Sequence, residues 1–156
     1  MAREAGDIAS SLGIKTIYVT KSKSELIRWK FKEKIILEKD LMQYKQLPFI
    51  IAIAESNIRK SLAKKYKNQL KFTNLIHPSA TFGLDQKKTV EKSIGTIIAA
   101  GVRFTNNTSV GDFCIFNQNT TIAHDCDIKN YIHIAPGANI SGNVILLDSC
   151  WIGAGA

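Results

Sequence analysis

Two adjacent residues, His124 and Asp125, are of the types that move protons at neutral pH. A neutral imidazole can accept a proton near pH 7, and a neighbouring carboxylate can fix its tautomer and stabilise the imidazolium. Another histidine, His133, follows in the same stretch of sequence. Taken alone, a histidine of this kind is more often a surface residue than a catalytic one, so the surrounding pattern has to be considered.

That surrounding pattern is a repeat with a period of six residues. Its markers are the ten apolar residues Ile98, Phe104, Val110, Phe116, Ile122, Ile128, Ile134, Ile140, Leu146 and Ile152. Four positions after each marker the residue is mostly small or β-branched. Neither an α-helix nor an ordinary strand has this period. A β-solenoid does, with one hexapeptide on each side of a triangular coil, and we expect a parallel β-helix here.

The three cysteines share one position of this repeat. Cys114, Cys126 and Cys150 all fall in the small-residue slot four positions after a marker. We interpret them as reduced residues that fill the interior of the coil. No CxxC pair argues for a metal or redox site instead.

The register of the repeat places His124 and Asp125 at a corner of the coil. Three sides of six residues close one coil, so residues eighteen apart stack at a strand spacing of about 4.8 Å. Gly142 is therefore expected beside His124, one coil later. A glycine there would let a ligand approach the backbone next to the imidazole, although an ordinary turn glycine is the alternative interpretation.

His133 takes an outward position on a different side of the coil from His124. A full side and another corner separate the two histidines, which puts them more than roughly 10 Å apart at about 3.3 Å per residue. If both serve one site, neighbouring subunits must supply them. The spacing therefore favours a homotrimer with sites between the subunits.

The first half of the chain has the pattern of a small α/β unit. We expect helices over Arg3–Leu12, ended by Gly13, and over Asn57–Leu70, with Ile58, Leu62 and Tyr66 on its apolar face and basic residues opposite. We expect strands over Lys15–Thr20, Pro48–Ala54 and Lys71–Ile76. Strand, helix and strand in this order predict a right-handed crossover. Ser22–Lys45 is left unassigned.

His77 and Pro78 mark the expected boundary, since the residue before a proline is extended. We predict two domains, residues 1–77 and 78–156. Residues 79–97 are expected to be a transition, with a polar loop at Asp85–Lys88 that interrupts the six-residue rhythm.

Charge is concentrated in the first half. Residues 1–74 carry 16 Lys and Arg against 7 Asp and Glu, whereas residues 75–156 carry 5 against 6. Such a surface can attract phosphorylated ligands, although solvated lysines are the plainer interpretation. No aromatic platform or RNA-binding signature supports nucleic-acid binding.

The longest apolar run is too short to span a membrane, and the N-terminus lacks the apolar core of a signal peptide. We therefore expect a cytoplasmic protein without membrane contact.

Several segments together resemble one family. The stretches Asn74–Ala80 (NLIHPSA), Asn117–Ile128 (NQNTTIAHDCDI), His133–Val144 (HIAPGANISGNV) and Ile51–Ala63 (IAIAESNIRKSLA), with the opening helix, are similar to the NeuD/PglD-type sugar acetyltransferases. The resemblance covers nearly the whole chain. It implies a left-handed parallel β-helix of hexapeptide repeats, preceded by a partial Rossmann-like α/β subdomain that binds a sugar nucleotide.

The resemblance also implies roles for individual residues. His124 matches the general base, Asp125 the acid that supports it, and His133 the histidine at the acetyl-donor end of coenzyme A. Gly142 and Asn117 match positions that contact cofactor and substrate, respectively. The expected co-substrate is acetyl-CoA, and no metal is implied.

The chain departs from the family pattern at both ends. The first strand and the glycine-rich loop, which cradle phosphates in the family, would lie before Met1, and Ala54 replaces a common glycine. The repeats still run at Ala156, where relatives continue with further coils. From the sequence we therefore expect a member that is truncated at both ends.

The expected function is transfer of an acetyl group from acetyl-CoA to an amino or hydroxyl group of a nucleotide-linked sugar or sialic acid, in polysaccharide synthesis. The alternative is a non-catalytic trimeric scaffold that binds sugar nucleotide or coenzyme A. A zinc enzyme of the γ-carbonic anhydrase type is less well supported, because its site needs three converging histidines.

Overall fold

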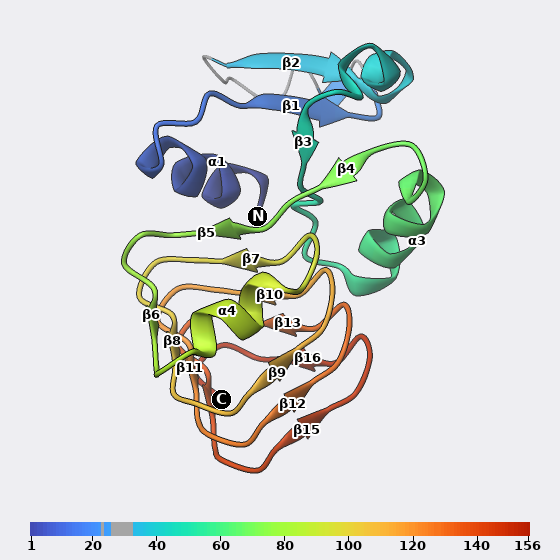
Figure 1. Ribbon diagram of the computed structural model, residues 1–156. Helices are drawn as coiled ribbons and strands as arrows, with labels where there is room; N and C mark the ends of the chain where they lie inside the picture. The colour runs from blue at the N-terminus through green and yellow to red at the C-terminus, as the bar shows by residue number, and fades with distance from the viewer. Residues whose placement is uncertain (23, 26–32) are drawn as a thin grey trace.

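The computed structural model describes residues 1–22, 24–25 and 33–156, and it joins a small α/β part to a long parallel β-helix (Figure 1). The α/β part consists of α1 (Ala2–Ser11), β1 (Ile17–Thr20), β2 (Lys34–Leu37), the 3-10 helix η1 (Glu38–Tyr44), β3 (Pro48–Phe49), α3 (Ser56–Tyr66) and β4 (Lys71–Phe72). The unassigned segment Ser22–Lys45 contains β2 and η1, and part of it lies outside the described residues.

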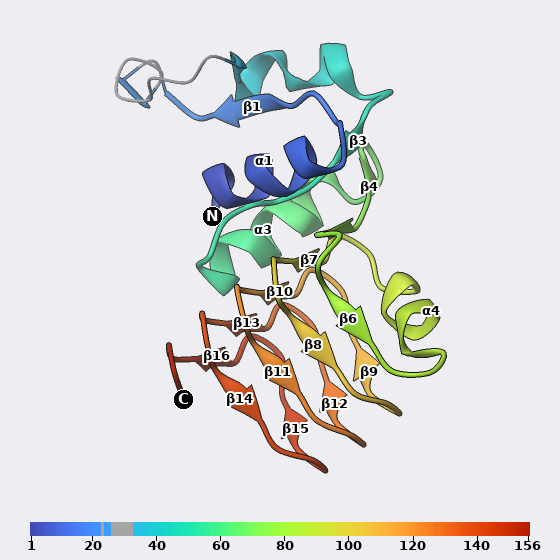
Figure 2. The same ribbon diagram turned by 90° about the vertical axis from the view of Figure 1, so that its left-hand side faces the viewer.

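The β-helix has three parallel sheets, one on each side of the coil. The first sheet contains β5 (Leu75–Ile76), β7 (Ile97–Ile98), β10 (Ile115–Phe116), β13 (His133–Ile134) and β16 (Trp151–Ile152). The second contains β6 (Thr81–Phe82), β8 (Arg103–Phe104), β11 (Thr121–Ile122) and β14 (Asn139–Ile140). The third contains β9 (Ser109–Val110), β12 (Asp127–Ile128) and β15 (Ile145–Leu146). The expected β-helix is confirmed, and Figure 2 shows its coils stacked below the α/β part.

The eighteen-residue register is also confirmed. Ile115 pairs with Ile97 and with His133, and Thr121 pairs with Arg103 and with Asn139. Each of the ten markers is the second residue of its strand, and all are buried except the half-buried Val110 and Ile152. Apolar markers therefore form the continuous interior of the prism, which is the main source of its stability.

The small-residue slot has a second role besides filling space. The Sγ atom of Cys114 lies 3.1 Å from the carbonyl oxygen of Lys129, and that of Cys126 lies 3.2 Å from the carbonyl oxygen of Ser141. Burial raises the pKa of the Cys114 thiol to about 12, so the thiol keeps its proton and can donate. All three cysteines are free thiols, as expected. The thiols of Cys114 and Cys126 thus provide donors for backbone carbonyls next to the corners.

The first coil is longer than the others, because it contains α4 (Gln86–Glu91). Leu75 pairs with Ile97, and Thr81 with Arg103, instead of with residues eighteen positions on. The expected polar loop at Asp85–Lys88 is wrong, since α4 begins within it and buries Gln86 and Val90. Both views show α4 beside the open edge of the third sheet, next to β9 (Figures 1 and 2).

The outer face of the first sheet is buried rather than exposed. Ile97 and Ile115 point away from the prism interior, yet both are fully buried. They belong to the same apolar cluster as Ala5, Ile8 and Ala9 of α1. The α/β part and the β-helix therefore share one hydrophobic core across this face. The predicted division at residue 77 stays a prediction, and β5, which precedes it, already pairs within the first sheet.

Several details of the α/β part differ from expectation. α1 and β1 are confirmed, and the parallel pairing of β3 with β4 around α3 matches the expected crossover. The strand expected over Pro48–Ala54 pairs only at Pro48–Phe49, because the later carbonyls turn to a side chain of α3. The strand expected over Lys71–Ile76 is split between two sheets. Its first part, β4, pairs with β3, and its second part, β5, belongs to the first sheet of the β-helix.

The most buried polar side chain of α3 is Arg59, which is 0% exposed. Its guanidinium donates to five backbone carbonyls, at 2.6 to 3.1 Å: those of Ile53, Ala54, Phe113, Tyr131 and Ile132. The first two acceptors follow β3, and the other three lie at corners of two successive coils. Burial lowers the pKa of Arg59, but a guanidinium stays protonated in proteins. Arg59 therefore ties the α/β part to the β-helix.

This arrangement corrects part of the predicted apolar face of α3. Tyr66 is buried and Leu62 is half-buried against apolar residues, as expected, but Ile58 is 45% exposed. The other buried residues of the helix are Ser56, Arg59 and Ala63. The helix is rotated because the arginine has to reach the carbonyls of the β-helix corners. The helix also ends at Tyr66 rather than Leu70.

Replacement of Arg59 by Met should lower the free energy of unfolding by about 3–5 kcal/mol, because five buried carbonyls would lose a charged donor. Urea denaturation measures this change. The control is Lys64→Met on the exposed side of the same helix, which should stay within about 0.5 kcal/mol of the wild type. Equal effects of the two variants would contradict the assigned role of Arg59.

Candidate active site

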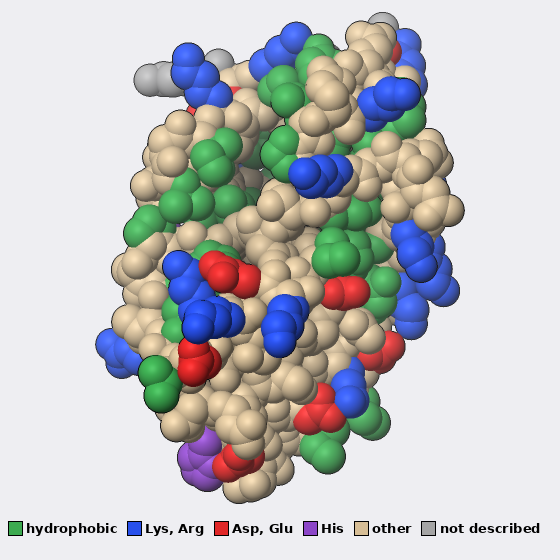
Figure 3. All heavy atoms as spheres, in the orientation of Figure 1, with side chains coloured by type: hydrophobic (Ala, Val, Ile, Leu, Met, Phe, Trp, Pro, Cys, Tyr) green, Lys and Arg blue, Asp and Glu red, His purple; other side chains and the backbone are tan. Residues whose placement is uncertain are grey.

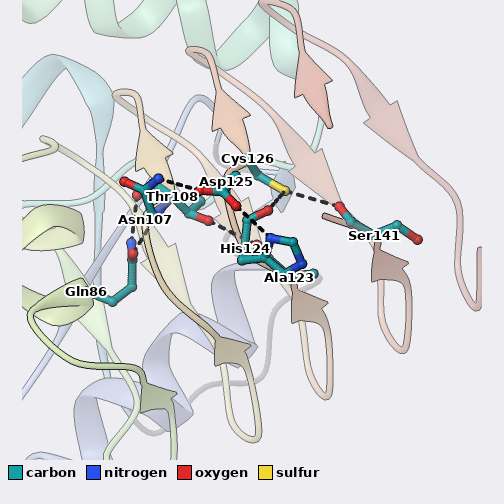
Figure 4. A network of polar contacts seen from close by, with 8 residues as sticks. All are labelled: Gln86, Asn107, Thr108, Ala123, His124, Asp125, Cys126 and Ser141. Carbon is teal, nitrogen blue, oxygen red and sulfur yellow. Dashed lines mark hydrogen bonds and ion pairs between the residues drawn. The ribbon is translucent and has the colours of Figure 1, made fainter. Parts of the chain in front are cut away.

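His124 and Asp125 form the corner between β11 and β12, as the register predicted. Asp125 has a left-handed backbone, with φ of 58°, and Asn107 and Asn143 take the same conformation one coil before and one coil after it. Backbone bonds connect these corners: the Asp125 amide donates to Asn106 and the Asn143 amide donates to His124. The corner is thus part of a stacked ladder, and Figure 4 shows it from close by.

The two side chains are hydrogen-bonded to each other. His124 Nδ1 lies 2.7 Å from Asp125 Oδ2, and the other carboxylate oxygen accepts a hydrogen bond from Asn107 Nδ2. The bonds from Asn107 and His124 lower the pKa of Asp125. An ionised carboxylate only accepts, so His124 Nδ1 carries the proton of this bond and Nε2 is left with a lone pair. The geometry therefore prepares Nε2 to accept a proton.

Gly142 lies against the face of the His124 imidazole. A Cβ atom at Gly142 would come within 2.7 Å of Cε1 and 2.8 Å of Nε2, which is closer than real Cβ contacts. The predicted stacking of Gly142 over His124 is confirmed. The side chains of His124 and Asp125 are 56% and 41% exposed, so the prepared nitrogen can be reached from solvent.

His133 lies in a different environment. It is on the outer face of the first sheet, where it is only 3% exposed. Its ring stacks on Trp151 one coil later, with centroids 3.9 Å apart. The position is outward as predicted, but this face is covered by protein. Desolvation, with smaller effects of Arg59 and the N-terminus, lowers the pKa of His133 to about 4, so the imidazole is neutral at pH 7.

Asn117 is the hydrogen-bond partner of His133. Its Nδ2 atom lies 3.1 Å from His133 Nε2 and donates to the Ile134 carbonyl at 2.9 Å. An amide nitrogen only donates, so Nε2 accepts and the ring proton of His133 is on Nδ1. Within the described part of the chain, this buried Nδ1 has no hydrogen-bond partner.

The structure therefore arranges the predicted residues in two groups. His124, Asp125 and Gly142 meet at corners between the second and third sheets, whereas Asn117 and His133 meet on the first sheet. Whether both groups serve one site, across subunits of a trimer, stays a prediction.

Three residues near these groups were not predicted from the sequence. Asn107 was given no role, although the eighteen-residue register puts it directly beside Asp125. Gln86 was assigned to a loop, and no sequence signal reveals its burial. Arg59 was assigned to a solvated face. Of the three, only the position of Asn107 follows from the eighteen-residue register.

Two further observations concern the described residues 1–22, 24–25 and 33–156. In these ranges, no three His, Cys, Asp or Glu side chains form a group that could hold a metal ion. No helix in these ranges is long and apolar enough to cross a membrane.

Known proteins with similar sequences or structures are sugar acetyltransferases. No protein-family model matches the sequence. GDP-perosamine N-acetyltransferase from Escherichia coli O157:H7 is 42% identical over 62 residues, which are 40% of this chain and 28% of that protein. The match therefore spans less than a third of the length of this relative.

Solved structures match far more of the chain. A histidine mutant of perosamine N-acetyltransferase from Caulobacter crescentus, in complex with CoA and GDP-perosamine, superposes with a TM-score of 0.80 at 19% identity over 96% of this chain and 71% of that one. The acetyltransferase domain of PglB from Neisseria gonorrhoeae FA1090, in complex with acetyl coenzyme A, gives 0.81 at 22% identity over 98% and 74%.

These comparisons define the class of fold. The chain has the fold of the left-handed β-helix acetyltransferases, as the resemblance in the sequence implied. Its sequence and structure neighbours are sugar acetyltransferases of the hexapeptide-repeat family, which confirms that resemblance. The Rossmann-like character of the α/β part stays a prediction.

The buried neutral His133 should make stability depend on pH. Its pKa is about 4 in the folded chain and about 6.5 when unfolded, so between these values the unfolded chain binds more protons. This contribution to stability is complete above pH 6.5 and is lost as the pH falls towards 4. Between pH 7 and pH 5 the wild type should lose about 2 kcal/mol more than His133→Gln in urea unfolding. Identical pH dependence in both proteins would refute this assignment.

Proposed function

We propose that this protein transfers an acetyl group from acetyl-CoA to the amino group of a nucleotide-linked sugar. The observation that carries the proposal is the His124 corner. There, Asp125 accepts a hydrogen bond from the protonated Nδ1 of His124. The exposed imidazole presents Nε2 beside Gly142, which has no Cβ atom. This is the arrangement that a general base for acyl transfer requires.

The reaction follows from this geometry. The sugar amine attacks the thioester carbonyl, and a C–N bond forms as the C–S bond breaks. His124 Nε2 takes the proton that the amine loses, and the departing thiolate is protonated to give free CoA. Asp125 stabilises the imidazolium that exists between these two proton transfers. The missing Cβ at Gly142 leaves room for a reactant next to Nε2.

The substrate class is supported by both the relatives and the α/β part. The curated relative is an N-acetyltransferase for GDP-perosamine, so we favour an amine over a hydroxyl as acceptor. A groove of about 390 Å³ is lined by Lys21, Glu38 and Lys65, among others. Lys21 follows β1 and Glu38 follows β2, and ligands bind at such carboxyl ends of parallel strands. Lysine side chains also gather over α3 (Figure 3), which suits a diphosphate.

The second group of residues also belongs to the proposal. His133 is assigned to the acetyl-donor end of CoA and Asn117 to the substrate. Gly142, from the first group, is assigned to the cofactor. The unpaired Nδ1–H of His133 supports this role, since a buried donor without a partner is suited to bonding a ligand carbonyl. A cytoplasmic homotrimer, with sites shared between subunits, stays part of the proposal.

An assay of acetyl transfer from acetyl-CoA to GDP-perosamine, monitored by the release of the free CoA thiol, tests this function. The wild type should turn over, and His124→Ala should lower kcat by about 10²- to 10⁴-fold, the usual contribution of a general base. His77→Ala is the matched control, because the side chain of His77 bonds only its neighbour Ser79 among the described residues. Full activity of the His124→Ala variant would refute the proposal. CoA binding without turnover by the wild type would instead favour the non-catalytic scaffold.

A second variant tests the space beside the imidazole. Gly142→Ala should lower kcat by about 10- to 100-fold, because its Cβ would displace the His124 ring from its position. Stability should change little, since the ring is exposed and can move away. Gly153→Ala is the control, because nothing lies within 4 Å of a Cβ atom there. If both alanine variants retain the wild-type kcat, the ring position does not matter for the reaction.

A further inference from the structure

The residue that contacts Asp125 from the preceding coil is Asn107. It lies eighteen positions earlier and takes the same left-handed corner conformation, with φ of 55°. Its Nδ2 atom donates to Asp125 Oδ1, while Asp125 Oδ2 accepts from His124 Nδ1. Each carboxylate oxygen therefore has one partner, and the three side chains form the chain Asn107–Asp125–His124 that Figure 4 shows.

The backbone next to Asn107 is held in place by α4. Gln86 is only 2% exposed, and its side-chain amide makes two hydrogen bonds with the backbone of Thr108. These bonds reproduce the pairing that a strand of a further coil would provide. The Thr108 hydroxyl in turn donates to the Ala123 carbonyl at 3.0 Å, directly before His124. Asn107 therefore extends from a fixed point towards the carboxylate.

Asp125 needs such support because it is 41% exposed at a corner. A carboxylate with only one bond there can rotate and exchange its histidine partner for water. The hydrogen bond from Asn107 is the largest cause that lowers the pKa of Asp125, ahead of the bond with His124. Asn107 thus acts on both the orientation and the charge of the group that orients the imidazole.

We propose that Asn107 is a positioning residue: it holds Asp125 so that the proton of His124 stays on Nδ1 and Nε2 remains the base. Its kinetic consequence rests on the acetyl transfer proposed above, whereas its effect on the histidine tautomer does not. Asn107 would touch neither the substrate nor the reacting atoms.

Two variants of the protein separate this role from a merely structural one. Asn107→Gly deletes the side chain but accepts the left-handed backbone without strain. Asn107→Asp keeps the shape and the turn preference but replaces the donor by a second carboxylate. The matched control is Asn119→Gly, which removes the same side chain from a corner with φ of 59° elsewhere in the prism.

The primary readout is the ¹⁵N chemical shifts of His124 Nδ1 and Nε2 by NMR at a pH where the ring is neutral. In the wild type and in Asn119→Gly the Nδ1–H tautomer should dominate. In both Asn107 variants the tautomers should mix. With acetyl-CoA and GDP-perosamine, kcat should fall about 10-fold in these variants, with KM for either substrate unchanged.

Unchanged nitrogen shifts in both Asn107 variants would overturn the inference, whatever the kinetics. If the Asn107 variants change the tautomer of His124 but the wild type itself transfers no acetyl group, the positioning role of Asn107 is upheld and the proposed function is refuted. Thermal unfolding of each variant confirms that the comparison is made between folded proteins.

Discussion

Stacking of residues eighteen positions apart is the constraint on which this structure depends. Parallel pairing in three sheets repeats the same corner at each coil, so a side chain at one corner lies beside its counterparts in the coils before and after it. Asn107 meets Asp125 and Gly142 meets His124 for this reason. The candidate site is thus built from three successive coils by the eighteen-residue register, which holds from β7 to β16.

Buried contacts, and not only the continuous backbone, attach the α/β part to the β-helix. Apolar outward positions on the first sheet pack against α1, and Arg59 satisfies carbonyls from both parts. A buried cation is tolerated because its donors reach five backbone carbonyls, at 2.6 to 3.1 Å. The same covered face holds His133, and the low pKa of this residue follows from that burial. Burial of this face therefore both attaches the α/β part to the β-helix and keeps the His133 imidazole neutral.

Much of the fold was predictable because a period of six has few structural solutions. The markers, the corner position of His124 and the contact with Gly142 follow from register alone. The burial of His133 does not, although Ile97, Ile115 and Trp151 at equivalent outward positions carried a signal that this side differs from the others. Arg59 and Gln86 were missed for another reason, since nothing in a local pattern shows that a polar side chain will satisfy distant backbone groups.

The central claim is that His124 Nε2 accepts a proton from the amine of a nucleotide sugar. A crystal structure of the protein with CoA and GDP-perosamine tests it most directly, because it shows where the amine lies. The account predicts the amine nitrogen at hydrogen-bond distance from Nε2, about 2.6–3.2 Å, beside the Gly142 backbone. An amine bound elsewhere, with His124 facing only solvent, would contradict it.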